Sequence, residues 1–334
     1  MAESTERVVG NGATDTYKGD IVVGVDGSDE SFAALKWALI EAGKTGQKVN
    51  AVFAWTHSWD MGGEPDSDEE WAQMRHDISE SLRQWVDQAS DGIDFNPEDL
   101  KLTSVKASGS TALLHIGADS AQIVVGRRSL GRVARWFLGS LSSSLAEEAK
   151  VPVTVVHPGS EPATTNAEDD IAAALNPDAS SMKNVDAEHM LDERHRLPVV
   201  VGIDGSTTSK RALDFAIDEA KINERPLQVL FCWQMKDLGK LPGYETTVPS
   251  VKEGQAHAER VVRDAVAKAN IPDGMDVQAH AFHIPAGKGL VSASRYANRI
   301  VVGSRGLSGL DAHFLGSVSK QVVDNAECTV TVVH

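Results

Sequence analysis

The sequence predicts an α/β fold made of two duplicated, doubly wound domains, each with a mostly parallel sheet and helices on both faces. Short β-branched runs alternate with amphipathic segments along the chain, which is typical of parallel strands joined by helices. The order of these segments in the first half returns in the second half. With 334 residues, the chain is long enough for two domains of ordinary size.

In the first half, apolar runs that end in turn residues predict strands, and apolar residues spaced three and four apart predict helices. Ser28 is predicted to cap the first helix, and Gly43 and Gly46 to end it. The predicted strands are 21–25, 49–55, 100–107, 121–125 and 151–157. The predicted helices are the one after Ser28, one with an apolar face from Trp71 to Val86, 111–118, and 140–150.

The second half repeats four of these strands. They are 199–203 before Asp204-Gly205-Ser206, 227–233, 300–302 before Gly303, and 328–334. The spacing between matching residues hardly changes, because Asp204 follows Asp26 by 178 residues and Gly303 follows Gly126 by 177. Such agreement along both halves indicates a duplicated domain.

Two polar segments fall outside the repeat. Residues 1–19 are predicted to be a disordered lead-in, and the acidic segment 158–197, which is poor in aromatic residues, a linker. A short helical turn is conceivable at 171–175. We therefore expect one domain at 20–157 and a second at 198–334.

Composition limits the expected partners and location. The net charge of −16 repels nucleic acid and anionic membranes, so neither is an expected partner. No apolar run is long enough to span a membrane and no signal pattern opens the chain, so a cytoplasmic location is expected. Cys232 and Cys328 lie in apolar runs and are expected to be small core residues in a reducing compartment, with no metal site.

The stretch 301–319 combines a predicted strand end with small residues at fixed spacing. Gly303 ends the strand where the chain turns, and Gly306 can adopt a positive φ without a Cβ penalty. Gly316 and Ser317 open a helix, whose free N–H groups and positive dipole end suit a phosphate. Arg305 can neutralise phosphate charge. The alternative interpretation is purely structural: this turn binds no ligand, and Asp26 and Asp204 only cap the helices that follow them.

The pattern G-x2-G-x9-G-[ST], together with the early V-G-[VI]-D-G-S, resembles that of the universal stress protein family, over about residues 20–157 and 198–334. The resemblance implies a tandem member with two five-stranded parallel sheets of strand order 3-2-1-4-5. It also implies ATP binding in the nucleotide-binding members and dimerisation through the fifth strands. The runs VPVTVVH and CTVTVVH can then pair within one chain as an intrachain pseudo-dimer, with a further homodimer left open.

The resemblance also implies a set of nucleotide contacts in the second half. Glycines and serines of the loop take the phosphates and ribose, Asp204 lies near the adenine or ribose, and strand two supplies an apolar adenine contact at Val229. The implied set is Ile203, Asp204, Val229, Gly303, Arg305, Gly306, Gly316, Ser317, Val318 and Ser319. Mg²⁺ can bridge the phosphates, but no pair of carboxylates points to a dedicated metal site.

The first half departs from the family pattern at one position. The corresponding set is Val25, Asp26, Ala51, Gly126, Arg128, Ser129, Gly139, Ser140 and Ser142. Ser129 replaces the second glycine, at a cost of roughly 1 kcal/mol if that position needs a positive φ. Arg127, Arg128, Arg132 and Arg135 make this loop basic, which either compensates by charge or serves an interface. The second half is therefore the stronger candidate.

Two residue types recur at matching places. His157 and His334 end the fifth strands, which suggests a structural or interface role, and Trp55 and Trp233 end the second strands, which suggests pocket or core packing. No Ser/His/Asp order indicates a nucleophile. The leading hypothesis is a stress-response protein that holds ATP and is not an enzyme, with slow ATPase activity left open. The alternatives are a cyclic AMP binder, a signalling or scaffold module that binds no nucleotide, and an enzyme of related fold.

Overall fold

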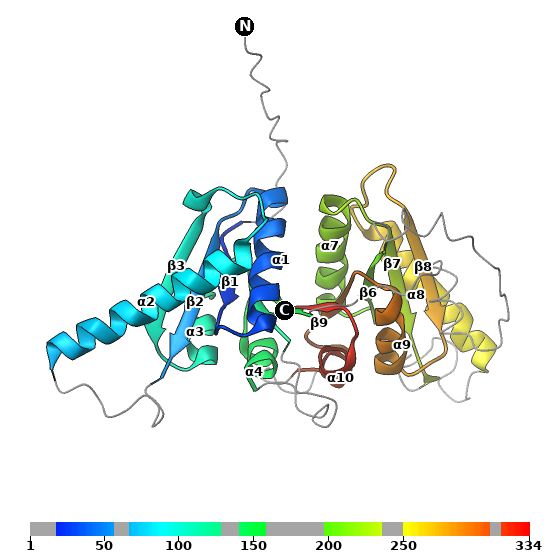
Figure 1. Cartoon of the computed structure of the whole chain (residues 1–334). Helices are drawn as coiled ribbons and strands as arrows, with labels where there is room; N and C mark the ends of the chain where they lie inside the picture. Colours follow the sequence, from blue (N-terminus) through cyan, green and yellow to red (C-terminus); the bar gives the residue numbers. More distant parts are fainter. Residues whose placement is uncertain (1–17, 57–66, 128–139, 158–196, 236–249, 308–314) are drawn as a thin grey trace, which may run out of the picture.

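The computed structural model describes residues 18–56, 67–127, 140–157, 197–235, 250–307 and 315–334. The strands of the first half are β1 (Ile21–Gly24), β2 (Val49–Trp55), β3 (Leu100–Lys106), β4 (Gln122–Gly126) and β5 (Val153–Val156). Those of the second half are β6 (Val199–Gly202), β7 (Leu227–Cys232), β8 (Val277–Phe282), β9 (Arg299–Gly303) and β10 (Thr329–Val333). They form one sheet that runs across the molecule (Figure 1).

The strand order of this sheet is β3-β2-β1-β4-β5-β10-β9-β6-β7-β8. Each half therefore has the predicted order 3-2-1-4-5, and every strand pair within a half is parallel. The halves join where β5 pairs with β10 in the antiparallel direction, with Thr154 opposite Thr331. The two predicted fifth strands thus pair with one another within a single chain.

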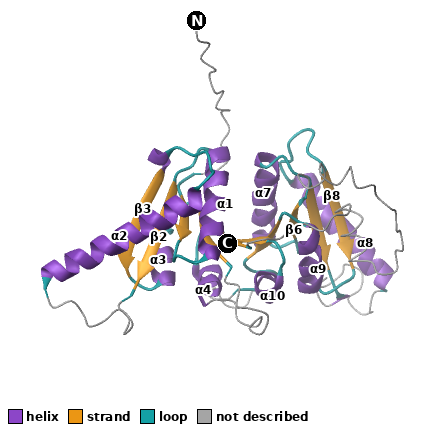
Figure 2. Cartoon of the chain, viewed as in Figure 1, coloured by secondary structure: helices purple, strands orange, loops and turns teal. Residues whose placement is uncertain are grey.

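Helices cover both faces of the sheet (Figure 2). They are α1 (Asp29–Thr45), α2 (Asp68–Ser90), α3 (Gly109–Ile116), α4 (Ser140–Glu148), α7 (Thr207–Ile222), α8 (Val251–Lys268), α9 (Ala286–Ala293) and α10 (Ser317–Asn325), with 3₁₀ turns η3 (Pro97–Asp99) and η6 (Ser294–Tyr296). On the face of α3, α4, α9 and α10, one apolar core runs through both halves. On the face of α1, α2, α7 and α8, each half has its own core.

The predicted helix boundaries hold within a few residues, with one correction. Ser28 caps α1 by accepting a hydrogen bond from the Ser31 N–H, as predicted. Gly46 ends this helix in the left-handed conformation with φ 72°, but Gly43 lies inside it and ends nothing. The fifth strand of the first half is shorter than predicted and begins at Val153, after Pro152. Proline lacks the N–H that a strand inside a sheet donates.

A buried group of charged side chains lies where α1, α7 and β9 meet at the middle of the molecule. The Arg299 guanidinium pairs with the Glu219 carboxylate, and both side chains are almost fully buried. Arg299 Nη2 also lies 4.0 Å from Glu41 Oε2, and its guanidinium stands 4.6 Å from the centroid of the Trp37 ring. Because Glu41 and Trp37 belong to the first half, this cluster joins the two halves.

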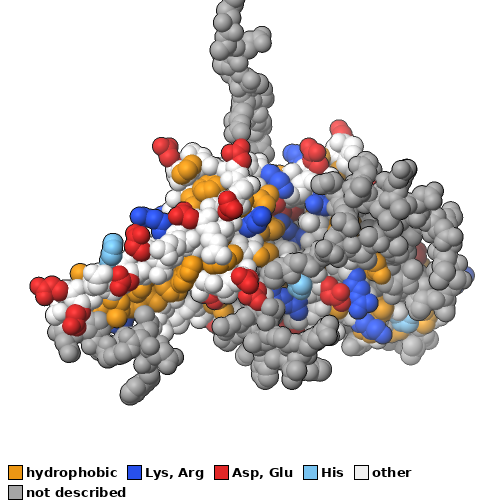
Figure 3. All heavy atoms as spheres, viewed as in Figure 1, with side chains coloured by type: hydrophobic (Ala, Val, Ile, Leu, Met, Phe, Trp, Pro, Cys, Tyr) orange, Lys and Arg blue, Asp and Glu red, His pale blue; other side chains and the backbone are white. Residues whose placement is uncertain are grey.

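The cysteines, the surface charge and the polar segments were also considered in the sequence predictions. Cys232 and Cys328 are buried free thiols in the core, as predicted, and burial raises the pKa of each to about 12. None of the helices that the structure describes is long and apolar enough to cross a bilayer. Acidic and basic side chains are mixed over the face shown in Figure 3. The segments 1–17, 158–196 and 171–175 lie outside the described residues.

Candidate functional site

A small cavity of ≈ 130 Å³ lies at the carboxyl ends of β1, β2 and β4 in the first half. Parallel sheets commonly bind their ligands at this edge. The cavity brings together four residues of the predicted site: Val25, Asp26, Gly126 and Ser142. Its other lining residues are Gly24, Ser28, Glu30, Ser31, Val52, Ala54, Gly109, Leu113, Val125 and Leu141. Asp26, the strand-end aspartate of the prediction, and Ser142 in the first turn of α4 therefore share one space.

The two strand-end aspartates hold the turn that precedes each first helix. Asp26 Oδ1 accepts hydrogen bonds from the Ser28 N–H at 3.1 Å and from the Ser28 hydroxyl at 2.5 Å. Asp204 Oδ1 accepts one from the Ser206 N–H at 2.9 Å. The serines, not the aspartates, cap the helices. Asp204 therefore positions the capping residue, and its second carboxylate oxygen is directed elsewhere.

The second carboxylate oxygen of Asp204 contacts the loop that follows β9. Asp204 Oδ2 accepts a hydrogen bond from the Leu307 N–H at 3.0 Å, and a Cβ added to Gly306 would lie 2.4 Å from the same oxygen. Gly306 does not use the positive φ that is open to a glycine. The glycine is needed because the loop passes close to Asp204, not because its backbone is left-handed.

The glycines that end β4 and β9 are required by close packing. A Cβ on Gly126 would lie 2.2 Å from the Glu30 carbonyl oxygen, and one on Gly303 would lie 3.0 Å from Thr208 Cγ2. Glu30 and Thr208 both lie in the first turn of the helix that follows the first strand of their half. These glycines bring the end of the fourth strand against that helix.

The start of α10 carries backbone N–H donors of the predicted site. The helix begins at Ser317 with Gly316 as its N-cap, and no side chain within the described residues caps its first turn. By contrast, serines cap α1, α2, α3, α7 and α8. The Gly316 N–H donates to the Ser304 carbonyl oxygen at 2.8 Å, and the buried Ser319 hydroxyl donates to the Gly303 carbonyl oxygen at 2.6 Å. Uncapped N–H groups at a helix start suit an anion.

Ser304 was not singled out from the sequence. It follows Gly303 directly, is 3% exposed, and its hydroxyl has no hydrogen-bond partner in the described part of the chain. A buried hydroxyl without a partner costs free energy, so an unpaired one beside a predicted ligand site is informative. Of the other predicted residues, Arg305 and Ser317 are exposed to solvent. Val318 packs against the apolar core that runs through both halves.

Three predicted contacts lie on the opposite face of the sheet. Ala51 and Val229 belong to the cores under α1–α2 and α7–α8, and Ile203 lines a groove between α7 and α8. Val52 and Ala54 of β2 line the first-half cavity in place of Ala51. Successive side chains of a strand point to opposite faces, and β2 and β7 are buried on both, so the sequence did not reveal which face was which.

The first-half loop lies largely outside the described residues, namely Arg128, Ser129 and Gly139, together with Arg132 and Arg135. The backbone of Ser140 begins α4. Arg127 precedes this loop and donates to the Asp324 and Ala326 carbonyl oxygens at the end of α10. This contact crosses between the halves, which supports the interface interpretation for the first arginine.

The repeated histidine and tryptophan occupy packed positions. His334 Nδ1 lies 3.1 Å from the Val151 carbonyl oxygen, and Nε2 lies 3.0 Å from that of Ala146, so this ring joins the second half to the first. Burial lowers the pKa of His334. Trp233 is fully buried and stacks on the His283 ring with centroids 4.4 Å apart. Neither arrangement presents a reactive group to a ligand.

A family model described as the universal stress protein family matches residues 19–157 and again 196–334. The chain belongs to the universal stress protein family. Universal stress protein Rv2005c of Mycobacterium tuberculosis is 30% identical over 319 residues, which cover 94% of this chain and 96% of that protein. Universal stress protein Rv2623 of the same organism is 28% identical over 321 residues, with the same coverage of both chains.

Solved structures agree with this universal stress protein fold. The crystal structure of a universal stress protein from Archaeoglobus fulgidus matches with a TM-score of 0.57 at 19% identity, over 95% of this chain and 97% of that chain. A second match is a putative universal stress protein from Pseudomonas aeruginosa, with a TM-score of 0.54 at 16% identity, over 96% and 95%. At these identities the likeness shows the fold alone.

Proposed function

We propose that this universal stress protein binds ATP in its second half, at the carboxyl ends of β6 and β9, and holds the nucleotide without rapid turnover. The observation that carries the proposal is the uncapped start of α10 at Gly316-Ser317, which follows β9 through a loop that touches Asp204. The helix start offers N–H donors and a positive dipole end to phosphate. In an acidic protein, such local donors are what an anionic ligand requires.

The roles of the residues follow from their positions. Gly306, Gly316, Ser317 and Ser319 hold the phosphates and ribose, and Asp204 contacts the ribose or adenine once its bond to the Leu307 N–H opens. The unpaired Ser304 hydroxyl is a further donor for the ligand. Arg305 neutralises phosphate charge. Mg²⁺ enters with the phosphates, since within the described ranges no three acidic, histidine or cysteine side chains group into a metal site.

The first half is proposed as the weaker site. Ser129 stands where the second half has Gly306. Arg127, next to the predicted phosphate loop, is engaged with the end of α10. We therefore expect one tightly bound nucleotide per chain. The second candidate function is that the first half works as an interaction module. The contact of Arg127 with the end of α10 favours it.

We also propose the domain division and the location that the sequence predicts. The domains are taken as 20–157 and 198–334 with a linker at 158–197, in a cytoplasmic stress-response protein. The two domains form an intrachain pseudo-dimer through β5 and β10. A further homodimer uses another surface, because each of these strands already has a neighbour on both sides.

Mass spectrometry of small molecules released from freshly purified protein, followed by calorimetry with ATP, tests this function. We expect adenine nucleotide near one equivalent. We expect Gly316→Val to weaken ATP binding sharply and to leave the fold intact. The Gly316 backbone (φ −59°, ψ 146°) is allowed for any residue, and the tightest contact of an added Cβ would be 3.3 Å, to the Ser304 carbonyl oxygen. Gly43→Val is the control, since a Cβ there meets nothing within 4 Å. Equal ATP affinity in the Gly316 variant and the wild type would count against the loop assignment.

The same preparation separates the alternatives. Competition of cyclic AMP against ATP in calorimetry identifies the preferred nucleotide. A folded chain whose unfolding temperature is indifferent to both nucleotides supports the scaffold function instead. Multiple-turnover phosphate release that is lost in Gly316→Val would establish a slow ATPase.

A further inference from the structure

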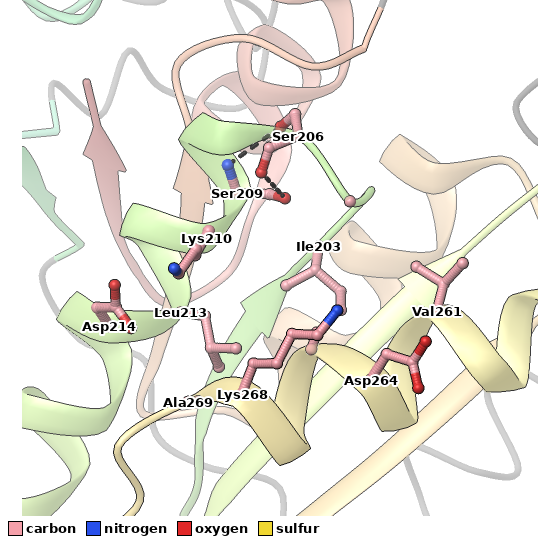
Figure 4. A pocket seen from close by; sticks show the side chains of 12 residues that line it. Ile203, Ser206, Ser209, Lys210, Leu213, Asp214, Val261, Asp264, Lys268 and Ala269 are labelled. Carbon is pink, nitrogen blue, oxygen red and sulfur yellow. Dashed lines mark hydrogen bonds between the residues drawn. The ribbon is translucent and has the colours of Figure 1, made fainter.

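A groove lies between α7 and α8, on the face of the sheet opposite to the proposed nucleotide site (Figure 4). Its volume is ≈ 390 Å³, within the range of small-molecule pockets. Ile203, Leu213 and Val261 give it apolar walls. Lys210 and Asp214 of α7 and Asp264 and Lys268 of α8 stand around it, so the rim carries two positive and two negative charges.

The first half shows what normally fills this space. There the indole of Trp85 from α2 lies against the turn after β1, so close that a Cβ on Gly27 would be 2.8 Å from the ring. The Phe53 ring meets the same indole edge-on, with centroids 5.0 Å apart and planes at 87°. Trp85 thus closes the gap between α1 and α2.

Val261 occupies the corresponding place in the second half. Gly205 matches Gly27 in the repeat, and a Cβ on Gly205 would be 3.7 Å from Val261 Cγ1. A bicyclic aromatic ring has therefore been replaced by an isopropyl group at the same turn. Phe32 of α1, which packs against its core, is likewise matched by Lys210 of α7. Two aromatic side chains of the first copy are thus absent from the second, at positions where Lys210 and Val261 line the groove.

We propose that the groove between α7 and α8 binds a small molecule with a planar bicyclic aromatic ring of indole size. The ring takes the place that Trp85 fills in the first half, and it contacts Ile203, Leu213 and Val261. Polar substituents of the ligand lie at the rim among the four charges. Neither lysine at the rim forms a salt bridge within the described residues, so both ammonium groups are available to a ligand.

The groove and the proposed phosphate contacts lie on different faces of the sheet. The walls belong to the core under α7 and α8, whereas α10, whose start carries the proposed phosphate contacts, packs against the core of the other face. Burial raises the pKa of Asp214, which agrees with a partly desolvated rim. Apolar cavities smaller than this one are known to bind single aromatic rings.

Titration of the full chain with 5-fluoroindole, followed by ¹⁹F NMR, tests the proposal without interference from the protein's own tryptophans. We expect saturable binding at one site per chain with a dissociation constant below about 1 mM. Excess ATP should leave this binding unchanged. Val261→Trp should fill the groove, raise the unfolding temperature and weaken 5-fluoroindole binding at least tenfold.

Val251→Trp is the matched control, because Val251 is an exposed residue at the start of the same helix and does not line the groove. It should bind the probe like the wild type. If Val261→Trp fails to fold, Ala265→Phe fills the same groove from the next turn and should also weaken binding. Absence of saturable binding to the wild type, displacement of the probe by ATP, or equal binding by the filled variants would overturn the proposal.

Discussion

The Thr154 and Thr331 hydroxyls lie 2.9 Å apart and hydrogen-bond to one another across the junction of the two halves. The two residues are 177 positions apart, hold the same place in the two copies, and are fully buried. Thr154 Oγ1 also donates to Gln122 Oε1 at 3.0 Å. The two equivalent threonines of the repeat thus bond to one another. Of these two side chains, only that of Thr154 has a second hydrogen-bond partner among the described residues.

This asymmetry predicts unequal effects of removing the two hydroxyls. Thr154→Val leaves both Thr331 and the buried Gln122 amide without their partner, so it should cost about 1–3 kcal/mol. Thr331→Val leaves Thr154 bonded to Gln122 and should cost under about 1 kcal/mol. Urea unfolding of the two variants and the wild type measures the difference. Equal destabilisation would show that the Thr154–Gln122 bond contributes nothing.

The buried Arg299 should be critical for stability. Arg299→Met leaves the Glu219 carboxylate, which is 1% exposed, without its cation, and breaking such a pair costs about 3–5 kcal/mol. Arg295→Met is the control, because Arg295 and Glu327 form an exposed pair worth at most about 1 kcal/mol. Chemical unfolding monitored by circular dichroism compares the two. Partial recovery in the double variant Arg299→Met, Glu219→Gln would assign the cost to the uncompensated charge.

His334 should make stability depend on pH. Burial lowers its pKa below the ordinary value of 6.5, although hydrogen bonds to the Ala146 and Val151 carbonyls act in the opposite direction. The unfolded chain therefore takes up the proton first as pH falls. This contribution is fully present above about pH 6.5 and is lost below it. Urea unfolding at pH 7.5 and 5.5 should show a smaller loss in His334→Gln than in the wild type, and an equal or larger loss would contradict the assignment.

Gly306→Ala tests the contact between the loop and Asp204. The added methyl would lie 2.4 Å from Asp204 Oδ2 and must push the carboxylate away from the place where it would contact the nucleotide. On the proposed function, we expect ATP affinity to fall about tenfold. The same substitution in an Asp204→Ala background should have little further effect, because the atom it strikes is gone. Calorimetry with ATP on the four proteins of this cycle provides the measurement, and additive losses would exclude the contact.

Much of the fold could be predicted because the two halves of the sequence repeat the same order of strands and helices. Matching runs such as those ending in Asp26 and Asp204 fixed the strands, and the family resemblance supplied their order. The face of each second strand could not be predicted. Ala51 and Val52 are both fully buried, so their polarity does not distinguish the two sides of the sheet.

The junction and the groove were missed for different reasons. Arg299, Glu41 and Glu219 are charged, and charged residues are ordinarily expected on the surface, so nothing along the chain indicated that they meet in the interior. The groove could have been anticipated, because the aligned halves already place Lys210 where the first copy has Phe32. What the alignment lacks is the packing that places Trp85 over Gly27.

The β5–β10 pairing lies within one polypeptide, so its strength does not depend on the concentration of the protein. Two separate subunits that meet through such strands come apart on dilution, whereas two halves of one polypeptide keep an effective local concentration set by the chain that connects them. The pairing therefore does not weaken when few copies are made. Both halves are also always present in equal number, so one copy can change its pocket while the other keeps the paired arrangement intact.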